Sequence, residues 1–299
     1  HTFRPKSMAP EDILAINSDV ILLQKDLALT YASGAQLTVG LSVSNFSPDS
    51  LSGPLHWQVQ AGNETLADGE VQTVDVAQGH IGPGGDIVLS LPVVVSPARL
   101  SLRVDLPAVQ RTYRNEWSAW ILPAPAAPEH PDIPVYADAG QAADGLDWPL
   151  LPLPAEGELP AKAVYLVTWL EPRVVDAMLR GASVVHLGGG PQRLPTWGIT
   201  FRTTWWKAGD SLSRNHCGTL VYDHPITRDL APDGWCDAGW FELLEGAAKT
   251  SLEGAPTRPH VIIRALPSLA AVQDEALLYE VAVGKGTLMV SGLNHAKAA

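Results

Sequence analysis

The 299-residue sequence has only two cysteines, Cys217 and Cys236, and this shortage excludes a disulfide-rich scaffold. Their spacing matches no zinc motif, which leaves two buried thiols or one disulfide that clamps a loop. A disulfide would indicate an oxidising compartment. The compartment stays open, with a periplasmic or extracellular location slightly favoured. No apolar run reaches the ~20 residues that a membrane helix needs, so we expect no membrane contact.

Basic residues are also scarce. Lys and Arg number 20 against 32 Asp and Glu, and the formal net charge is -12. Phosphate binding needs a concentrated basic face, so the sequence predicts no nucleic-acid partner. An acidic surface suits neutral ligands such as sugars. Apolar residues make up 46% of the chain and charged residues 17%, which is enough to bury a full core.

The motifs of nucleotide binding and nucleophilic catalysis are missing. Gly188-Gly189-Gly190 follows a predicted strand, but it is not Gly-x-Gly-x-x-Gly and no Lys-Ser or Lys-Thr follows it. No Ser or Cys stands on a glycine-flanked turn of the kind that presents a nucleophile. Cys217 adjoins His216, yet neighbours on an extended chain point in opposite directions. We therefore expect no catalytic residue in this chain and no cofactor.

Metal ligation and glycoside hydrolysis are the remaining site chemistries. His186, His216 and His224 would be the metal ligands, but nothing in their spacing requires a metal, and none is expected. Asn115-Glu116 has the form of a glycosidase acid/base pair. Hydrolysis needs a second carboxylate and a deep cleft, and neither is indicated, so a structural role is favoured.

The first part of the chain has the patterning of an antiparallel β-sandwich. Apolar and polar residues alternate over 36–44, 55–59 and 100–106, which predicts strands with one buried face. Turn clusters are expected at 45–49, 62–63 and 82–85. Short strands at this spacing indicate an immunoglobulin-like sandwich over residues 1–122. The proline-rich segment 123–134 is expected to be a semi-rigid linker.

Residues 135–299 have a different pattern, which predicts an α/β domain. A buried strand at 163–167, a helix within 171–181 and a second buried strand at 183–187 form a βαβ unit with parallel pairing. A strand at 261–263, a helix over 269–283 and a strand at 287–290 extend it. We expect a three-layer domain with a mostly parallel sheet, interrupted by an insertion at 191–256. Because the chain starts without Met and stops after a strand, we expect residues to be missing at both ends.

Tryptophan is concentrated in the predicted insertion. Five of the ten tryptophans lie there: Trp197, Trp205, Trp206, Trp235 and Trp240. Exposed indole faces stack on the apolar faces of sugar rings, so these residues are candidates for carbohydrate binding. The alternative is a small local core beneath the insertion, which is favoured for any single tryptophan.

Several short motifs resemble the C-terminal region of bacterial glycoside hydrolase family 2-type proteins. In the first half these are Ser44-Asn45-Phe46-Ser47, Leu55-His56-Trp57 and the segment 115–123. In the second half they are Gly218-Thr219-Leu220, Asp223-His224-Pro225, Asp233-Gly234-Trp235, 240–244 and 280–288. The second half also resembles a class I glutamine-amidotransferase fold that lacks its cysteine nucleophile.

The resemblance implies a catalytic (β/α)8 barrel with both carboxylates upstream of His1 in the same polypeptide, and none of the matching positions is catalytic. We therefore expect a non-catalytic accessory region that supports the barrel and contacts oligo- or polysaccharide. Two alternatives remain open: an independent carbohydrate-binding module, and a small esterase that acts on decorated glycans.

Overall fold

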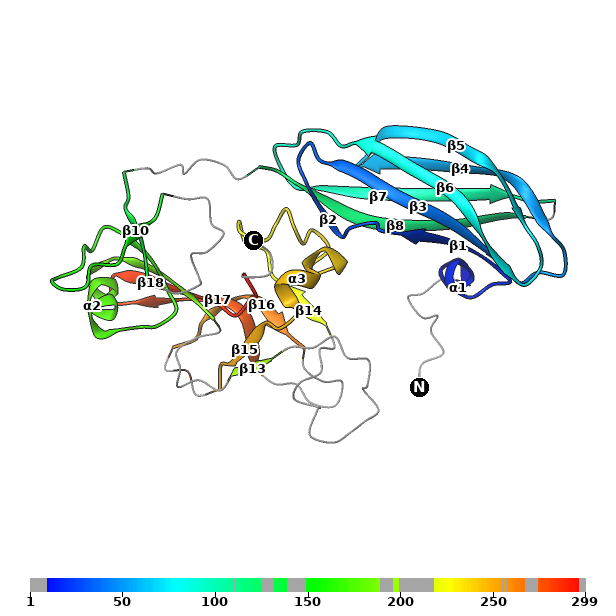
Figure 1. Ribbon diagram of the computed structural model, residues 1–299. Coiled ribbons are helices and arrows are strands. Elements are labelled where there is room, and N and C mark those ends of the chain that lie inside the picture. Colours follow the sequence, from blue (N-terminus) through cyan, green and yellow to red (C-terminus); the bar gives the residue numbers. More distant parts are fainter. Residues whose placement is uncertain are drawn as a thin grey trace. The chain divides into compact units, whose positions relative to one another are not determined.

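The computed structural model describes residues 10–109, 111–124, 132–138, 149–188, 196–198, 218–253, 255, 257–266 and 274–295 (Figure 1). The chain divides into two compact units, unit 1 (His1–Ala124) and unit 2 (Pro125–Ala299). Strands dominate both units, and the described helices are few and short. Within the described part of the chain, no helix is both long enough and apolar enough to cross a membrane.

Unit 1 consists of two β-sheets. The chain enters it through the helix α1 (Pro10–Ile16). Its strands are β1 (Val20–Lys25), β2 (Thr30–Ala32), β3 (Gln36–Asn45), β4 (Leu51–Ala61), β5 (Glu64–Val76), β6 (His80–Ser90), β7 (Ala98–Pro107) and β8 (Thr112–Leu122). One sheet has the order β1-β3-β6 and the other β2-β8-β7-β4-β5. All pairs are antiparallel except β2 with β8.

The two sheets of unit 1 form two layers (Figure 1), and a single hydrophobic core lies between them. The alternation over 36–44 correctly predicts β3, where Leu37, Val39, Leu41 and Val43 are all buried. The strands expected at 55–59 and 100–106 are likewise confirmed within β4 and β7. The core therefore follows directly from the period-two pattern.

The turn expected at 82–85 is wrong, because these residues lie inside β6. The register pairs Leu41 with Gly85 and Ser42 with Pro83, which leaves Gly84 as the extra residue of a β-bulge. A Cβ at Gly84 would lie 3.0 Å from the Leu41 backbone carbon. Glycine here thus permits close approach of two strands rather than a chain reversal.

Unit 2 is built on one mixed sheet. Its strands are β9 (Val135–Ala137), β10 (Leu151–Pro152), β11 (Val164–Val167), β12 (Ser183–Leu187), β13 (Thr196–Gly198), β14 (Thr219–Val221), β15 (Ala248–Ser251), β16 (His260–Ala265), β17 (Glu275–Val283) and β18 (Gly286–Ser291). The order is β10-β9-β11-β12-β18-β17-β15-β13, with β16 on β17 and β14 on β16. From β10 to β18 the pairs are parallel, and from β18 onward they are antiparallel.

The predicted βαβ unit is confirmed. β11 and β12 pair in parallel, and α2 (Pro172–Arg180) joins them. Pro172 occupies the first helical position, and Gly181 ends the helix at φ +131°. Val174 and Met178 are buried as expected, whereas Leu179 is exposed.

The expectations of a three-layer domain and of a helix over 269–283 need correction. The described helices of unit 2 are α2, α3 (Phe241–Leu244) and the 3-10 helix η2 (Ala238–Trp240). Residues 275–283 form the strand β17, which Gly284 (φ +60°) turns into β18. Strand partners on both edges of β17 override the helix propensity of its Ala, Leu and Glu residues. The described parts of 191–256 also supply strands to this same sheet.

Candidate functional site

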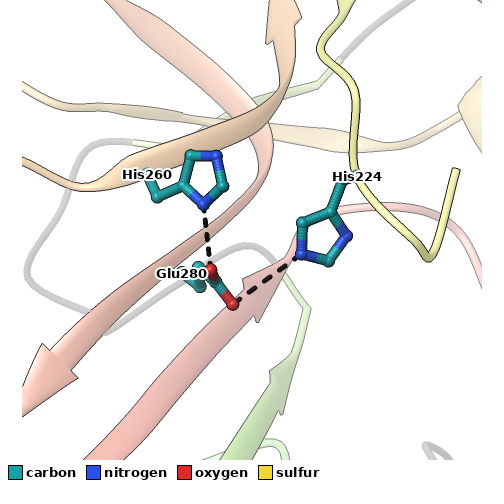
Figure 2. Close-up of side chains that lie close together, drawn as sticks. All are labelled: His224, His260 and Glu280. Atoms are coloured by element: carbon teal, nitrogen blue, oxygen red, sulfur yellow. Dashed lines mark hydrogen bonds and ion pairs between the residues drawn. The ribbon is translucent and has the colours of Figure 1, made fainter. Parts of the chain in front are cut away.

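Three side chains from separate segments of unit 2 converge at β17. His260 begins β16 and stands directly opposite Glu280 of β17 in the antiparallel register, so both side chains share one face. His224 follows β14, where the Tyr222 N–H donates to the Ile262 carbonyl and fastens the segment to β16. Figure 2 shows the two imidazoles approaching the Glu280 carboxylate from different sides. We call these three residues the His–Glu cluster.

The Glu280 carboxylate is shared between the two rings of the cluster. His260 Nδ1 lies 2.9 Å from Oε1 and His224 Nε2 lies 4.0 Å from Oε2. The rings meet edge to face, 5.8 Å between centroids. The side chain of His224 is 15% exposed, that of Glu280 29% and that of His260 57%, so the cluster is open to solvent on the His260 side.

A backbone contact orients the His224 ring. The Ile226 N–H donates to His224 Nδ1 over 3.2 Å. A backbone N–H can only donate, so Nδ1 accepts and the neutral ring carries its proton on Nε2, toward Glu280. Without any ligand, His260 Nδ1 is within hydrogen-bond distance of Glu280, and His224 Nε2 faces the same carboxylate at 4.0 Å.

Sequence reasoning identified only one member of this cluster. His224 was one of three histidines considered as metal ligands, and the structure groups it with His260 and Glu280 instead. His216 lies outside the described residues. His260 and Glu280 are twenty positions apart in two strands, so only the pairing register brings them together. Nitrogen and carboxylate donors at this spacing suit either a hydrogen-bonded network or a divalent metal ion.

His186 is buried at the end of β12, with 2% of its surface exposed. Among the described residues, neither ring nitrogen meets a partner in hydrogen-bond geometry. Burial lowers the pKa of His186 below its ordinary value of 6.5, although the nearby Thr168 carbonyl and Asp138 carboxylate favour the protonated ring. The folded protein therefore keeps this imidazole neutral. Gly188 follows at φ +108°, and 189–190 lie outside the described residues.

We expect acidification to destabilise unit 2 through His186. The unfolded chain protonates this ring below about pH 6.5, whereas the folded chain resists protonation, so the unfolded state binds more protons as the pH falls. The stability that comes from keeping His186 neutral is fully present above about pH 6.5, and it is lost as the pH drops toward the lowered pKa of this ring. Thermal melts between about pH 8 and about pH 5 should show this loss.

The variant His186→Leu should flatten that pH dependence and leave stability near pH 8 unchanged or higher, because it removes a buried ring that makes no well-formed hydrogen bond to the described residues. His295, whose pKa is also lowered by burial, keeps part of the slope in the variant. An identical slope in both proteins would show that His186 is not the titrating group.

Two further groups bear on nucleophilic chemistry. Ser291 Oγ lies 2.8 Å from His295 Nε2, but Ser291 is 2% exposed and its hydroxyl also accepts from the Leu293 N–H. This hydroxyl stabilises a turn and is not presented to a substrate. Cys236 is a free thiol, and burial raises its pKa to about 12, which keeps it protonated and a weak nucleophile. Cys217 lies outside the described residues.

The Asn115-Glu116 pair makes structural contacts in unit 1. The Asn115 amide donates to the Leu22 carbonyl over 3.0 Å and joins β8 to β1. Glu116 accepts from the Ser101 hydroxyl over 2.6 Å on the neighbouring strand. Both residues line an open groove of about 650 Å³ beside α1 and β1.

The tryptophans predicted to bind carbohydrate differ sharply in their surroundings. Trp235 is 55% exposed. Trp240 is 5% exposed and its indole N–H donates to the Leu230 carbonyl, so it belongs to a core and its ring cannot stack on a ligand. Trp197 lies in β13, where only the backbone is described. Trp205 and Trp206 lie outside the described residues.

Two family models match the sequence. Residues 35–123 match "Domain of unknown function (DUF8488)", and residues 165–299 match "Domain of unknown function (DUF8487)". A search of curated proteins gives no match. The two matched regions fall in different units of the structure, one in unit 1 and one in unit 2.

The solved structures with similarity to this chain are distant. Spo0M, a sporulation control protein from Bacillus subtilis, has a TM-score of 0.30 and 9% identity over 36% of this chain and 51% of its own. A cycloisomaltooligosaccharide glucanotransferase from Paenibacillus sp. has a TM-score of 0.26 and 12% identity, over 54% of this chain and 27% of its own. A beta-glucosidase from Listeria innocua has a TM-score of 0.26 and 14% identity, over 34% of this chain and 16% of its own. The chain thus spans about half of Spo0M and less than a third of each of the other two proteins.

Proposed function

We propose that this chain is a non-catalytic accessory region of a larger glycoside hydrolase of family 2 type, which supports the catalytic barrel and contacts carbohydrate. In this proposal residues 1–122 are an immunoglobulin-like sandwich, 123–134 a linker and 135–299 an amidotransferase-like unit without its nucleophile. The partner is the upstream catalytic domain of the same polypeptide. The short motifs quoted from the sequence support the assignment, and one exposed tryptophan supports the carbohydrate contact.

Trp235 is the observation on which the carbohydrate contact rests. Its neighbours on both sides are fastened to β14: the Val221 N–H donates to the Gly234 carbonyl, and the Cys236 N–H donates to the Thr219 hydroxyl. Gly234 takes φ +79°, which lets the chain turn there. A tryptophan whose neighbouring backbone is already fixed loses less entropy when it binds, so this exposed residue suits sugar stacking.

Two more exposed side chains come from the segment to which the neighbours of Trp235 are fastened. Leu220 of β14 and Tyr222, directly after β14, are each 43% exposed. The Arg264 Nε donates to the Tyr222 hydroxyl over 3.3 Å, and Arg264 is itself paired with Asp274, so the phenol ring is oriented as well. Oriented aromatic rings with polar edges are the usual means by which proteins hold neutral sugars.

The test is polysaccharide binding by the purified chain. Migration in native gels that contain a polysaccharide, and tryptophan fluorescence during titration with oligosaccharides, report binding directly. We expect Trp235→Ala to weaken binding at least about tenfold, because a central aromatic contact is removed.

Trp169 supplies the matched control, since it is 50% exposed but lies between β11 and α2, away from β14. Trp169→Ala should leave binding unchanged. Equal losses in both variants, or no retardation of the native chain by any polysaccharide, would contradict the proposed contact at Trp235.

A further inference from the structure

The His–Glu cluster offers the donor atoms of a metal site. One atom from each of His224, His260 and Glu280 can be chosen so that all three lie within 4.8 Å of one another. Two imidazole nitrogens with one carboxylate oxygen form a ligand set that suits Zn²⁺ and other divalent transition metals. We propose that these three residues bind a divalent transition metal ion, with zinc as the preferred ion.

The present distances lie close to those of a coordinated ion. Zinc holds nitrogen and carboxylate oxygen at about 2.0–2.2 Å, which places tetrahedral ligand atoms roughly 3.4 Å apart. Here the two nitrogen–oxygen separations are 2.9 Å for His260 and 4.0 Å for His224. To reach this separation, the His260 ring has to move slightly away from the Glu280 carboxylate and the His224 ring slightly toward it. We expect side-chain rotations to supply both shifts without any change in the strands.

The backbone positions of the three ligands are set in advance. His260 and Glu280 are a directly opposed cross-strand pair within the sheet, and the Tyr222 bond to Ile262 fixes the segment that carries His224. Metal binding replaces two hydrogen bonds: the 2.9 Å contact between His260 Nδ1 and Glu280, and the 3.2 Å bond from the Ile226 N–H to His224. Metal binding here therefore orders few additional groups.

The proposed site has three protein ligands and an exposed side. A zinc ion with three protein ligands keeps a further position for water or another small molecule, unlike a closed structural site with four. The half-exposed side chain of His260 leaves that position accessible. A bound ion would also cross-link the segment after β14 to β16 and β17, and so stabilise unit 2.

The experiment is a titration of the chelator-treated, dialysed chain with ZnCl2 by calorimetry, alongside thermal melts with and without zinc. We expect one saturable site and a higher melting temperature with zinc. His260→Gln and Glu280→Gln should each weaken binding by about 100-fold or more, because loss of even an outer-shell partner of a metal costs 10–100-fold. Both side chains are partly exposed, so circular dichroism without metal should match the native chain.

His56 and Glu70 supply the matched control in unit 1. They form a cross-strand His–Glu pair with 3.5 Å between Nδ1 and Oε2, and among the described residues no third ligand joins them. His56→Gln should leave zinc binding unchanged. Native-like zinc affinity in both His260→Gln and Glu280→Gln, or no saturable binding by the native chain, would overturn the proposal. These outcomes are separate from the polysaccharide measurement on Trp235.

Discussion

Replacing Glu275 with glutamine should destabilise unit 2 by about 3–5 kcal/mol, because it leaves a buried ammonium group without its counter-charge. Lys249 of β15 and Glu275 of β17 form an ion pair with 2.6 Å between Nζ and Oε2. Their side chains are only 2% and 5% exposed, so water cannot replace the lost partner. Urea denaturation followed by circular dichroism measures the difference in the free energy of unfolding.

Two further variants show whether the loss arises from the unpaired charge. The double variant Lys249→Met with Glu275→Leu removes both charges at similar volume, and we expect stability near that of the native chain or above it. Glu253→Gln makes the same chemical change at an exposed position and should stay within about 0.5 kcal/mol. A Glu275→Gln effect as small as that of Glu253→Gln would show that the pair does not compensate a buried charge.

The variant Gly286→Ala should lower the stability of unit 2 by about 3 kcal/mol through steric overlap. Gly286 begins β18, where the strand passes the end of α2. A Cβ at this position would overlap the carbonyl oxygens of Ala182 and Met178. Both are backbone atoms, so no side-chain rotation relieves the overlap. For a unit of this size the melting temperature should fall by roughly 5–10 °C, which calorimetry measures.

Gly157→Ala separates crowding from backbone conformation. Gly157 takes φ +88°, but no atom of the described residues lies within 4 Å of its added Cβ, so alanine there meets only the strain of the left-handed region, about 1 kcal/mol. If Gly286→Ala is no more harmful than Gly157→Ala, β18 can move away from α2 more easily than the structure indicates.

The fold was predictable where one residue pattern has one physical solution. Strict alternation over 36–44 can bury a single face only as a strand, and it became β3. Two apolar strands joined by a helix of nine residues favour parallel pairing, and β11 and β12 do pair in parallel. In these segments the local sequence is sufficient, because the spacing of apolar residues predicts the type of element without knowledge of its partner.

The prediction was wrong where the partner decides the element. Residues 275–283 contain Ala, Leu and Glu, which favour a helix, yet the pairing with β16 and β18 makes them a strand. Pro83 and Gly84 have the composition of a turn, yet they form a bulge against Leu41. Local preference is worth less than about 1 kcal/mol per residue, and a buried sheet position outweighs it.

The candidate site was likewise predictable from residue type but not from contacts between distant segments. Sequence reasoning could name His224 as a possible ligand and Trp235 as a possible sugar contact, because residue type alone suggests that chemistry. It could not join His224 to His260 and Glu280, since the cluster depends on the β16–β17 register and on one backbone bond at Tyr222. It also could not separate exposed Trp235 from buried Trp240.

By itself the sequence determined that the chain is acidic, rich in apolar residues and divided between a region of alternating strands and one with a βαβ unit. The tertiary structure alone decided that the sheet of unit 2 is mixed and that Lys249 and Glu275 form a buried ion pair. It also decided that two histidines meet one carboxylate. The physical reason is the separation along the chain over which each effect acts. Hydrophobic periodicity acts within a few residues, whereas strand register and burial depend on contacts between residues far apart in the chain.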